Sequence, residues 1–258
     1  MWQTAISDIG KNKINIKGYP IAQLIEHAGY AGTVYLLLKG EIPSENDAKL
    51  LEAILVSSVD HGVTPPSTFS ARTVASTGAD LNSCVAAGIL AISRYHGGAI
   101  EDCMELLLET ERLKYEEKLS DKSAAKKMIT SYREANKRLA GFGHRVHSAD
   151  PRTDVLFKRA EQLGQSGEYV TLARTLEQEL ASVLGKILPL NVDGAIAALL
   201  CELDFDPVMA NGFFMIARLP GLLAHIQEEK SRFKPMRKID QNEVEYDGPK
   251  ERFVKGRK

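Results

Sequence analysis

Four short clusters in the sequence combine histidine or aspartate with glycine, which places a titratable group beside open backbone. They are Asp60-His61-Gly62, Tyr95-His96-Gly97-Gly98-Ala99, Gly141-Phe142-Gly143-His144-Arg145-Val146 and Pro189-Leu190-Asn191-Val192-Asp193-Gly194. Imidazoles and carboxylates are the side chains that most often transfer protons in enzymes. Each cluster alone is weak evidence, but as a set they indicate general acid and base chemistry.

Each cluster also has a simpler structural interpretation. Asp60-His61-Gly62 could be the C-terminal cap of a preceding helix. Gly97-Gly98 could be a turn beside an incidental histidine, and the third cluster a polar connection between helices. Asp193 could be an N-cap of a helix beginning at Ala195. Apolar neighbours would raise the pKa of Asp193 and a helix N-terminus would lower it, and the sequence leaves open which effect dominates.

The third cluster is the one that could hold a ligand by its backbone. Two glycines before His144 predict a tight loop whose N–H groups can face a ligand, and Arg152 can bind a carboxylate through two hydrogen bonds. No strand precedes the loop and no third glycine follows, so a dinucleotide site is not indicated, and no GxxxxGK[ST] loop for ATP is present. His61, His96, His144 and Asp193 lack the helical spacing of metal ligands, so no metal site is expected.

Helices must position these clusters, because the helical period dominates the sequence. Pro43, Ser44 and Asp47 form a capping box that opens a helix over 44–60. Asp206-Pro207 opens another, expected to reach Arg232 with a kink at Pro220-Gly221. The remaining helices are expected over 81–95, which is apolar nearly all round and therefore buried, and over 99–118, 123–139 and 169–184. Alternation over 13–17 predicts a short hairpin.

Composition excludes several classes of protein. The chain has 258 residues, 44% of them hydrophobic, and a formal net charge of −1, which argues for a real core and against a nucleic-acid-binding protein. Cys84, Cys103 and Cys201 are far apart in apolar surroundings, so we expect buried thiols. No signal peptide is seen, and the longest apolar run, 34–38, is far too short to span a membrane. A cytoplasmic enzyme is expected.

In this order and spacing, the four clusters resemble the citrate synthase superfamily. Segments 17–21 and 35–43 are similar to its N-terminal signature, and 216–218 and 234–237 to its C-terminal arginine motifs. The chain is shorter than full-length citrate synthases, and 144–152 is one residue shorter than usual. Both features resemble stand-alone citryl-CoA lyase and the lyase module of ATP-citrate lyase. ATP-citrate lyases carry Phe at the position of His96, which leaves the direction of the reaction open.

The resemblance implies a role for each residue. His96 would stabilise the acetyl-CoA enolate, Asp193 would be the acid or base at the acetyl carbon, and His144 would act at the oxaloacetate carbonyl. The groups that hold substrate carboxylates would be His61, Arg152, Arg218 and Arg237, the last from a neighbouring subunit. CoA would lie over Gly141, Phe142 and Gly143, near Asn191, with the basic C-terminal segment as a further contact for its phosphates.

The resemblance also implies a nearly all-α, two-domain helical fold with at most a short N-terminal hairpin. Residues 1–97 and 190–258 would form the large domain, and 98–189 the small domain closing over CoA. The expected assembly is a homodimer or dimer of dimers. The expected activity is citryl-CoA lyase, which cleaves citryl-CoA to acetyl-CoA and oxaloacetate. CoA thioester is then a co-substrate, no tightly bound cofactor or metal is needed, and a separate citryl-CoA synthetase must supply the substrate.

Three alternatives remain open on the sequence. A citrate synthase or methylcitrate synthase would share the condensation site and differ by hydrolysing the thioester. A non-catalytic subunit could keep the same fold, although all the acid, base and arginine positions are present. A helical scaffold without a small-molecule site would leave the coincident His and Arg motifs unexplained.

Overall fold

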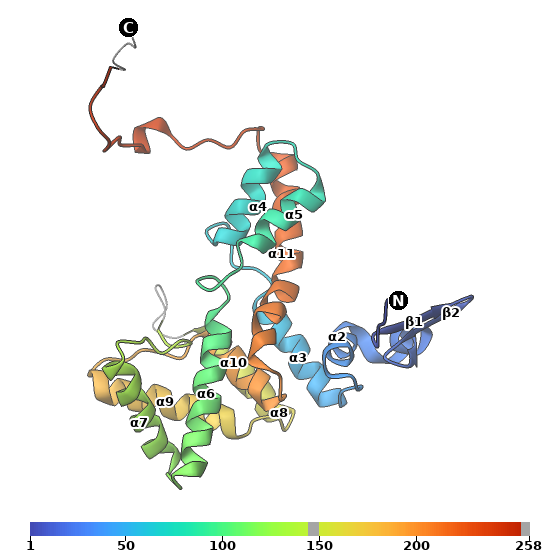
Figure 1. Ribbon diagram of the computed structural model, residues 1–258, viewed down its shortest axis with the longest axis vertical. Coiled ribbons are helices and arrows are strands. Elements are labelled where there is room, and N and C mark those ends of the chain that lie inside the picture. The colour runs from blue at the N-terminus through green and yellow to red at the C-terminus, as the bar shows by residue number, and fades with distance from the viewer. Residues whose placement is uncertain (144–149, 254–258) are drawn as a thin grey trace.

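Helices form most of the computed structural model, which describes residues 1–143 and 150–253 (Figure 1). A body of helices carries two projections, a small N-terminal sheet and an arm built from α4, α5 and the C-terminal half of α11. The C-terminal segment, with a short 3-10 turn η3 (Gln241–Glu243), extends away from the arm. The expected all-α class is confirmed.

The N-terminal sheet is antiparallel and has three strands in the order β1-β2-β3. β1 (Ser7–Gly10) pairs with β2 (Lys13–Ile16), and β2 pairs with β3 (Tyr19–Pro20). The hairpin expected at 13–17 is therefore confirmed, and β3 adds a third strand to it. Helix α1 (Ile21–Gln23) and a π-helical turn η1 (Leu24–Ala28) lead into α2 (Gly29–Lys39).

Helix α3 (Glu45–Ser57) starts where the capping box predicts. The Ser44 hydroxyl accepts a hydrogen bond from the Asp47 N–H at 3.1 Å and donates one to the Asp47 carboxylate at 2.7 Å. The helix ends at Ser57, three residues earlier than expected. The interpretation of Asp60-His61-Gly62 as its C-terminal cap is therefore wrong, and the three residues form a separate turn.

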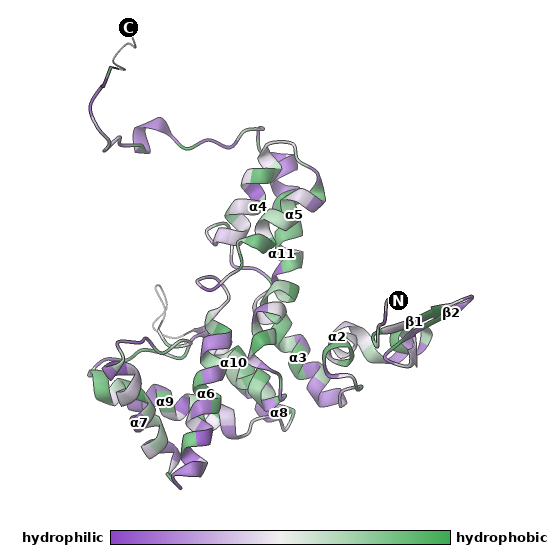
Figure 2. Ribbon diagram, viewed as in Figure 1, coloured by the Kyte–Doolittle hydropathy of each residue, from purple (hydrophilic) through white to green (hydrophobic). Residues whose placement is uncertain are grey.

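The arm consists of α4 (Pro66–Ser76), α5 (Leu81–Leu90) and the C-terminal half of α11 (Ala210–Arg232). Helix α5 stops five residues short of the expected Tyr95, and of its residues only Cys84 and Gly88 are buried. The expectation of a buried helix is wrong for the single chain: Leu81 is 53% exposed and Leu90 82% (Figure 2 colours α5 as hydrophobic). A side chain at Gly88 would meet Leu222 at 2.9 Å, so α5 and α11 pack closely.

Five helices make the body: α6 (Ala99–Glu116), α7 (Asp121–Glu134), α8 (Pro151–Gln162), α9 (Glu168–Leu184) and α10 (Val192–Glu202). Helix α10 is buried along almost its whole length and packs against α6, α8 and α9. One core cluster joins residues of α3, α6, α9 and α10. The division into 1–97 with 190–258 and 98–189 stays a prediction.

Two further expectations concern apolar segments. All three cysteines are buried and free, as expected. One stretch, Pro207–Arg232, is long and apolar enough to pass for a membrane span, so the expectation that no apolar run reaches that length needs correction. The stretch opens with a 3-10 turn, η2 (Pro207–Met209), capped by Asp206, and continues as α11, which packs against α3, α4, α5 and α6. Pro220 lies within α11.

Candidate active site

Asp193 lies in the first turn of α10, which begins at Val192 rather than at Ala195. The N-cap is Asn191, whose side-chain oxygen accepts the Gly194 N–H at 3.1 Å. The interpretation of Asp193 as the cap is therefore wrong. Because the cap is supplied two residues earlier, the Asp193 carboxylate is left for another use.

The surroundings of Asp193 decide the question that the sequence left open. Burial raises the pKa of this carboxyl, and the negative charge of Asp150 raises it further, while Arg152 and Arg218 lower it. The net direction is upward, so burial together with Asp150 outweighs the two cations. A carboxyl with a raised pKa can hold and release a proton nearer to neutral pH.

Asp150 is a buried carboxylate that organises the approach to Asp193. It caps α8 and accepts from the Arg152 backbone N–H and Nε, both at 3.0 Å, and from Arg152 Nη2 at 2.8 Å. It also accepts the Val192 N–H at 3.1 Å, which ties α8 to the start of α10. Burial raises the pKa of Asp150, but these hydrogen bonds outweigh it and hold the pKa below its ordinary value.

His96 lies in a tight turn between α5 and α6. Ser93 and His96 exchange backbone hydrogen bonds at 2.9 and 2.8 Å. Gly97 has φ +96°, and a side chain there would meet Phe214 at 2.8 Å and Asn211 at 2.9 Å, so the turn needs glycine. Both sequence interpretations of the two glycines hold, since they make a turn and also permit close approach.

The His96 ring is held by a buried serine. Its Nε2 lies 2.8 Å from the Ser67 hydroxyl of α4. The centroids of the His96 and Phe214 rings lie 5.4 Å apart, and the two rings are nearly perpendicular. Burial lowers the pKa of His96, and the charges of Arg218 and His61 lower it further. The ring is therefore kept neutral, and if Ser67 donates to Nε2, the proton sits on Nδ1.

Arg218 is buried on α11 and lies near His96. Its Nε donates to the Ser58 carbonyl at 2.9 Å, and its guanidinium stacks over Phe214 at 4.8 Å. Its Nη1 finds no hydrogen-bond partner within residues 1–143 and 150–253. A buried donor without a partner commonly marks the place of a ligand.

His61 follows the same electrostatic pattern. Although its ring reaches the surface, desolvation by neighbouring protein atoms lowers its pKa, and Arg152 and Arg218 lower it further. The structure thus brings together five of the predicted residues, from five segments: His61, His96, Arg152, Asp193 and Arg218. Two neutral imidazoles, two guanidiniums and one carboxyl with a raised pKa can bind carboxylates and transfer protons.

The glycine loop of the third cluster is paired with the loop before α10. The Asn191 N–H donates to Gly141 O at 2.9 Å, the Gly143 N–H donates to Pro189 O at 2.7 Å, and Asn191 Nδ2 donates to Gly143 O at 2.8 Å. The Gly143 N–H is therefore used inside the protein, which corrects the expectation for this one N–H group. Phe142 forms an isolated bridge with Leu190.

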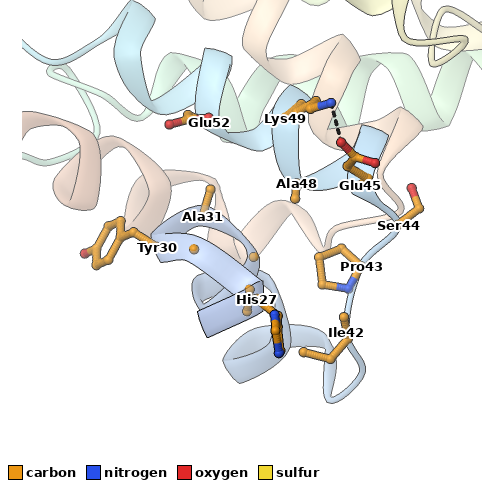
Figure 3. Close-up of a pocket in the computed structure, with 13 residues that line it drawn as sticks. His27, Tyr30, Ala31, Ile42, Pro43, Ser44, Glu45, Ala48, Lys49 and Glu52 are labelled. Atoms are coloured by element: carbon orange, nitrogen blue, oxygen red, sulfur yellow. Dashed lines mark hydrogen bonds and ion pairs between the residues drawn. The ribbon is translucent and has the colours of Figure 1, made fainter. Parts of the chain in front are cut away.

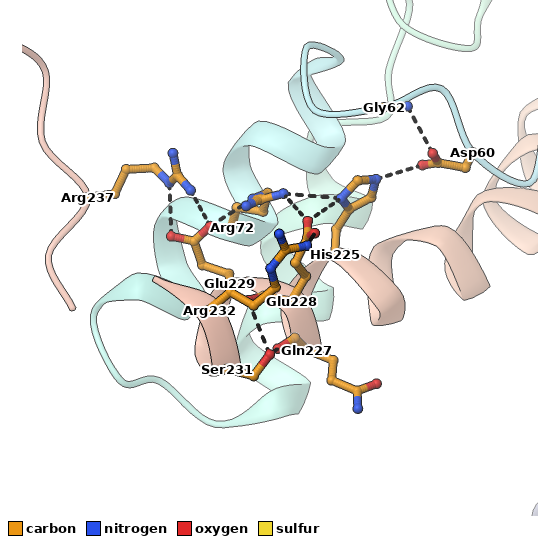
Figure 4. Close-up of polar contacts among 10 residues, drawn as sticks. All are labelled: Asp60, Gly62, Arg72, His225, Gln227, Glu228, Glu229, Ser231, Arg232 and Arg237. Carbon is orange, nitrogen blue, oxygen red and sulfur yellow. Dashed lines mark hydrogen bonds and ion pairs between the residues drawn. The ribbon is translucent and has the colours of Figure 1, made fainter. Parts of the chain in front are cut away.

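Two predicted residues are not placed with the others. His144 lies outside the described residues. Arg237 lies in the C-terminal segment after α11, where its Nε donates to Glu229 at 2.9 Å beside Arg72 (Figure 4). Arg237 therefore has no part in this chain's own cluster around Asp193.

Two cavities of the described chain lie elsewhere. One of about 540 Å³ separates the start of α2 from α3 and is lined by residues such as His27, Tyr30 and Lys49 (Figure 3). Another, of about 340 Å³, lies beside Arg72 and Arg237. Neither of these two cavities includes Asp193 or His96.

Sequence reasoning assigned no role to Ser67 or Asp150. Ser67 carried no local signal, because its partner His96 is 29 residues away. Asp150 could have been found, because Asp150-Pro151 repeats the capping pattern of Asp206-Pro207.

Comparison with known proteins places this arrangement in a family. Residues 43–238 match the family model described as citrate synthase, C-terminal domain. The chain belongs to the citrate synthase family. Among curated relatives of this family, citrate synthase 2 of Bacillus subtilis is 30% identical over 242 residues, which cover 92% of this chain and 61% of that protein. The chain thus spans about three fifths of that relative's length.

Solved structures similar to this chain include one of a protein of similar size. A citryl-CoA lyase from Hydrogenobacter thermophilus is 40% identical, with a TM-score of 0.90, and the match covers 98% of this chain and 97% of that one. An ATP citrate lyase from Methanothrix soehngenii, in complex with citrate and coenzyme A, shares the fold at 23% identity and a TM-score of 0.83, over 97% of this chain and 42% of that one.

Proposed function

We propose that this citrate synthase family enzyme is a citryl-CoA lyase, cleaving citryl-CoA to acetyl-CoA and oxaloacetate. The observation that carries the proposal is the convergence of His61, His96, Arg152, Arg218 and Asp193, in which Asp193 has a raised pKa and both histidines have lowered ones. The match to a citryl-CoA lyase along nearly the full length of both chains favours the lyase over a synthase.

Cleavage of the carbon–carbon bond leaves a thioester enolate, which is a poor leaving group unless its oxygen is stabilised. The neutral His96, held by Ser67, would donate a hydrogen bond from Nδ1 to that oxygen. Protonated Asp193 would then deliver its proton to the enolate carbon, giving the acetyl group. In this proposal His144 accepts the proton of the citryl hydroxyl.

Substrate carboxylates require cations that stay charged. Arg152 and Arg218 would supply them, and His61, whose lowered pKa favours the neutral ring, would donate a hydrogen bond to a substrate carboxylate. Asp150 fixes Arg152 by two side-chain hydrogen bonds, and the buried Arg218 Nη1 is a donor ready for a carboxylate. CoA would approach along the paired loops at 141–143 and 189–191, as a co-substrate rather than a bound cofactor.

The proposed assembly is a homodimer or a dimer of dimers in which Arg237 serves the neighbouring subunit. Two observations support it. Arg237 is anchored away from this chain's own Asp193, and the arm exposes Phe69, Leu81, Leu90 and Tyr95. An apolar surface of this kind commonly marks a protein–protein interface.

The second candidate is a citrate synthase or methylcitrate synthase, which the Bacillus subtilis relative favours. Both reactions use the same acid, base and cations, so the products must decide. The purified protein is given citryl-CoA, and we expect acetyl-CoA and oxaloacetate. Free citrate and CoA would establish the synthase, and no turnover would favour the non-catalytic alternative.

The roles are tested by substitution. Asp193→Asn should lower the rate of cleavage by about 100-fold or more, as expected for loss of a general acid. The matched control is Asp206→Asn, which likewise replaces a carboxylate by an amide but keeps a capping oxygen for η2, away from the site. An Asp193→Asn enzyme with undiminished cleavage would contradict the assignment.

A further inference from the structure

A continuous run of polar contacts crosses the arm from the turn at Asp60 to Arg237 (Figure 4). His225 of α11 lies in the middle, with Nε2 3.0 Å from Asp60 Oδ1 and Nδ1 3.3 Å from Arg72 Nη1. Arg72 Nε donates to Glu229 at 2.7 Å, and Arg237 donates to the same carboxylate. Glu229 is almost completely buried, so two guanidiniums from α4 and the C-terminal segment share one buried anion.

The contacts of His225 fix its tautomer. A guanidinium can only donate hydrogen bonds, so His225 Nδ1 must accept from Arg72. The ring proton is therefore on Nε2 and is donated to the Asp60 carboxylate. Glu228 lies 3.9 Å from Nδ1, beyond hydrogen-bond distance, and instead accepts from Arg72 Nη1 at 2.8 Å. His225 thus accepts a hydrogen bond from Arg72 and donates one to Asp60.

Asp60 in turn shapes the turn that carries His61. Its Oδ2 accepts the Gly62 N–H at 2.9 Å, so the carboxylate closes the turn around His61. Arg218 holds the Ser58 carbonyl on the other side of the turn. The backbone that presents His61 is therefore fixed at two points by α11, through Arg218 and through His225.

We propose that His225 is a positioning residue for substrate binding: it holds Asp60 so that His61 faces the substrate carboxylate, and Arg72 holds His225. The inference rests on the proposed role of His61 as a carboxylate ligand. Because Glu229 is shared by Arg72 and Arg237, the same run of contacts links this chain's site to the arginine proposed to serve the neighbouring subunit. Loss of the His225 contacts should weaken substrate binding more than it slows the chemical step.

Two amide substitutions test the two ring nitrogens of His225 separately. Glutamine in His225→Gln reaches the place of Nε2 and keeps a donor for Asp60. Asparagine in His225→Asn reaches only the place of Nδ1, so it keeps an acceptor for Arg72 but gives Asp60 Oδ1 no donor. Gln227→Ala, at an exposed neighbouring position on α11, is the control.

The measurement is steady-state kinetics with oxaloacetate varied at saturating acetyl-CoA, together with calorimetric binding of oxaloacetate. His225→Asn should raise KM and Kd for oxaloacetate about tenfold, the order expected for loss of one hydrogen bond to a charged group, with kcat little changed. His225→Gln and Gln227→Ala should behave like the wild type. Asp60→Asn should give the same increase, and the double variant Asp60→Asn, His225→Asn should add little.

Equal KM increases in His225→Gln and His225→Asn, or an unchanged KM in His225→Asn, would overturn the inference. Loss of kcat with unchanged KM would also overturn it, because it would place His225 in the chemistry. Thermal unfolding of each variant identifies those that fail to fold, and if His225→Asn does, Asp60→Asn then carries the test. If the wild type binds oxaloacetate but cleaves no citryl-CoA, the proposed reaction fails while the Kd comparison still tests His225. If the wild type binds no oxaloacetate, both fail.

Discussion

Replacing Asp150 by asparagine should destabilise the protein more than any single surface substitution. The side chain is fully buried and accepts four hydrogen bonds, three from Arg152 and one from the Val192 N–H. Asparagine is nearly isosteric but has one acceptor oxygen. If that oxygen stays with the Arg152 N–H and Nε, the amide nitrogen faces two donors, Arg152 Nη2 and the Val192 N–H.

The magnitude follows from those two lost contacts. Hydrogen bonds to a charged group contribute about 1.5–3 kcal/mol each, so about 3–6 kcal/mol is at stake. Breaking a buried ion pair by removing one partner costs about 3–5 kcal/mol, which agrees. Because the Arg152 side chain is 26% exposed and can turn to water, the lower end applies, about 3 kcal/mol. For a chain of this size that corresponds to a Tm lower by roughly 6–12 °C.

The assay is urea and thermal denaturation of Asp150→Asn beside Asp154→Asn. Asp154 lies one turn further along α8, and its exposed carboxylate pairs with Arg174, so its loss should cost less than about 1 kcal/mol. Since the folded-state pKa of Asp150 is lowered, its contribution is present above its unfolded pKa of about 4 and is lost as pH falls through the folded pKa. A difference between the two variants below about 1 kcal/mol at pH 7 would refute the reasoning.

Three further results are expected. Asp193→Asn should unfold at pH 7 at the same or a higher temperature than the wild type, and the difference should vanish towards pH 4, because a raised folded-state pKa makes the ionised form destabilising. Ser67→Ala should lower kcat about tenfold with little change in KM, because the hydrogen bond that fixes the enolate-binding imidazole is lost; steady-state kinetics test it. Gly141→Ala should lower stability by about 1–3 kcal/mol in denaturant, since its new methyl group would meet Cys103 Sγ at 2.6 Å. Gly185→Ala, also at positive φ but in open space, isolates the cost of conformation alone.

Features that depend on neighbouring residues in sequence could be predicted. Ser44 and Asp47 cap α3 as their spacing indicates, and Asp206-Pro207 opens the segment that leads into α11. The short strand at 13–17 follows from its alternation. In each case the determining contacts span only a few residues, so the sequence contains the whole interaction.

Features that depend on distant residues could not be predicted. The end of α3 is one example, because the Ser58 carbonyl is taken by Arg218, 160 residues later. The exposure of α5 is another, because an apolar sequence indicates that a helix is covered but not by which molecule. The direction of the Asp193 pKa required the depth of burial, which only the packing of α10 supplies.

The buried polar atoms that lack a hydrogen-bond partner also point to the candidate active site. Five buried side-chain atoms find no hydrogen-bond partner within the described part of the chain. Two of them lie near the residues proposed for catalysis: Asn211 Oδ1 approaches Gly97, and Arg218 Nη1 belongs to the guanidinium that stacks on Phe214, the ring that also contacts His96.

The carboxyl with the raised pKa lies at this same site. By contrast, the buried Glu229 of the arm is paired with two arginines. Proteins retain unpaired donors and desolvated acids chiefly where a ligand completes them. A site that only stabilised the fold would not place unpaired polar atoms and a desolvated acid near one imidazole. A site that binds a polycarboxylate and stabilises an enolate needs such groups free to bind the substrate.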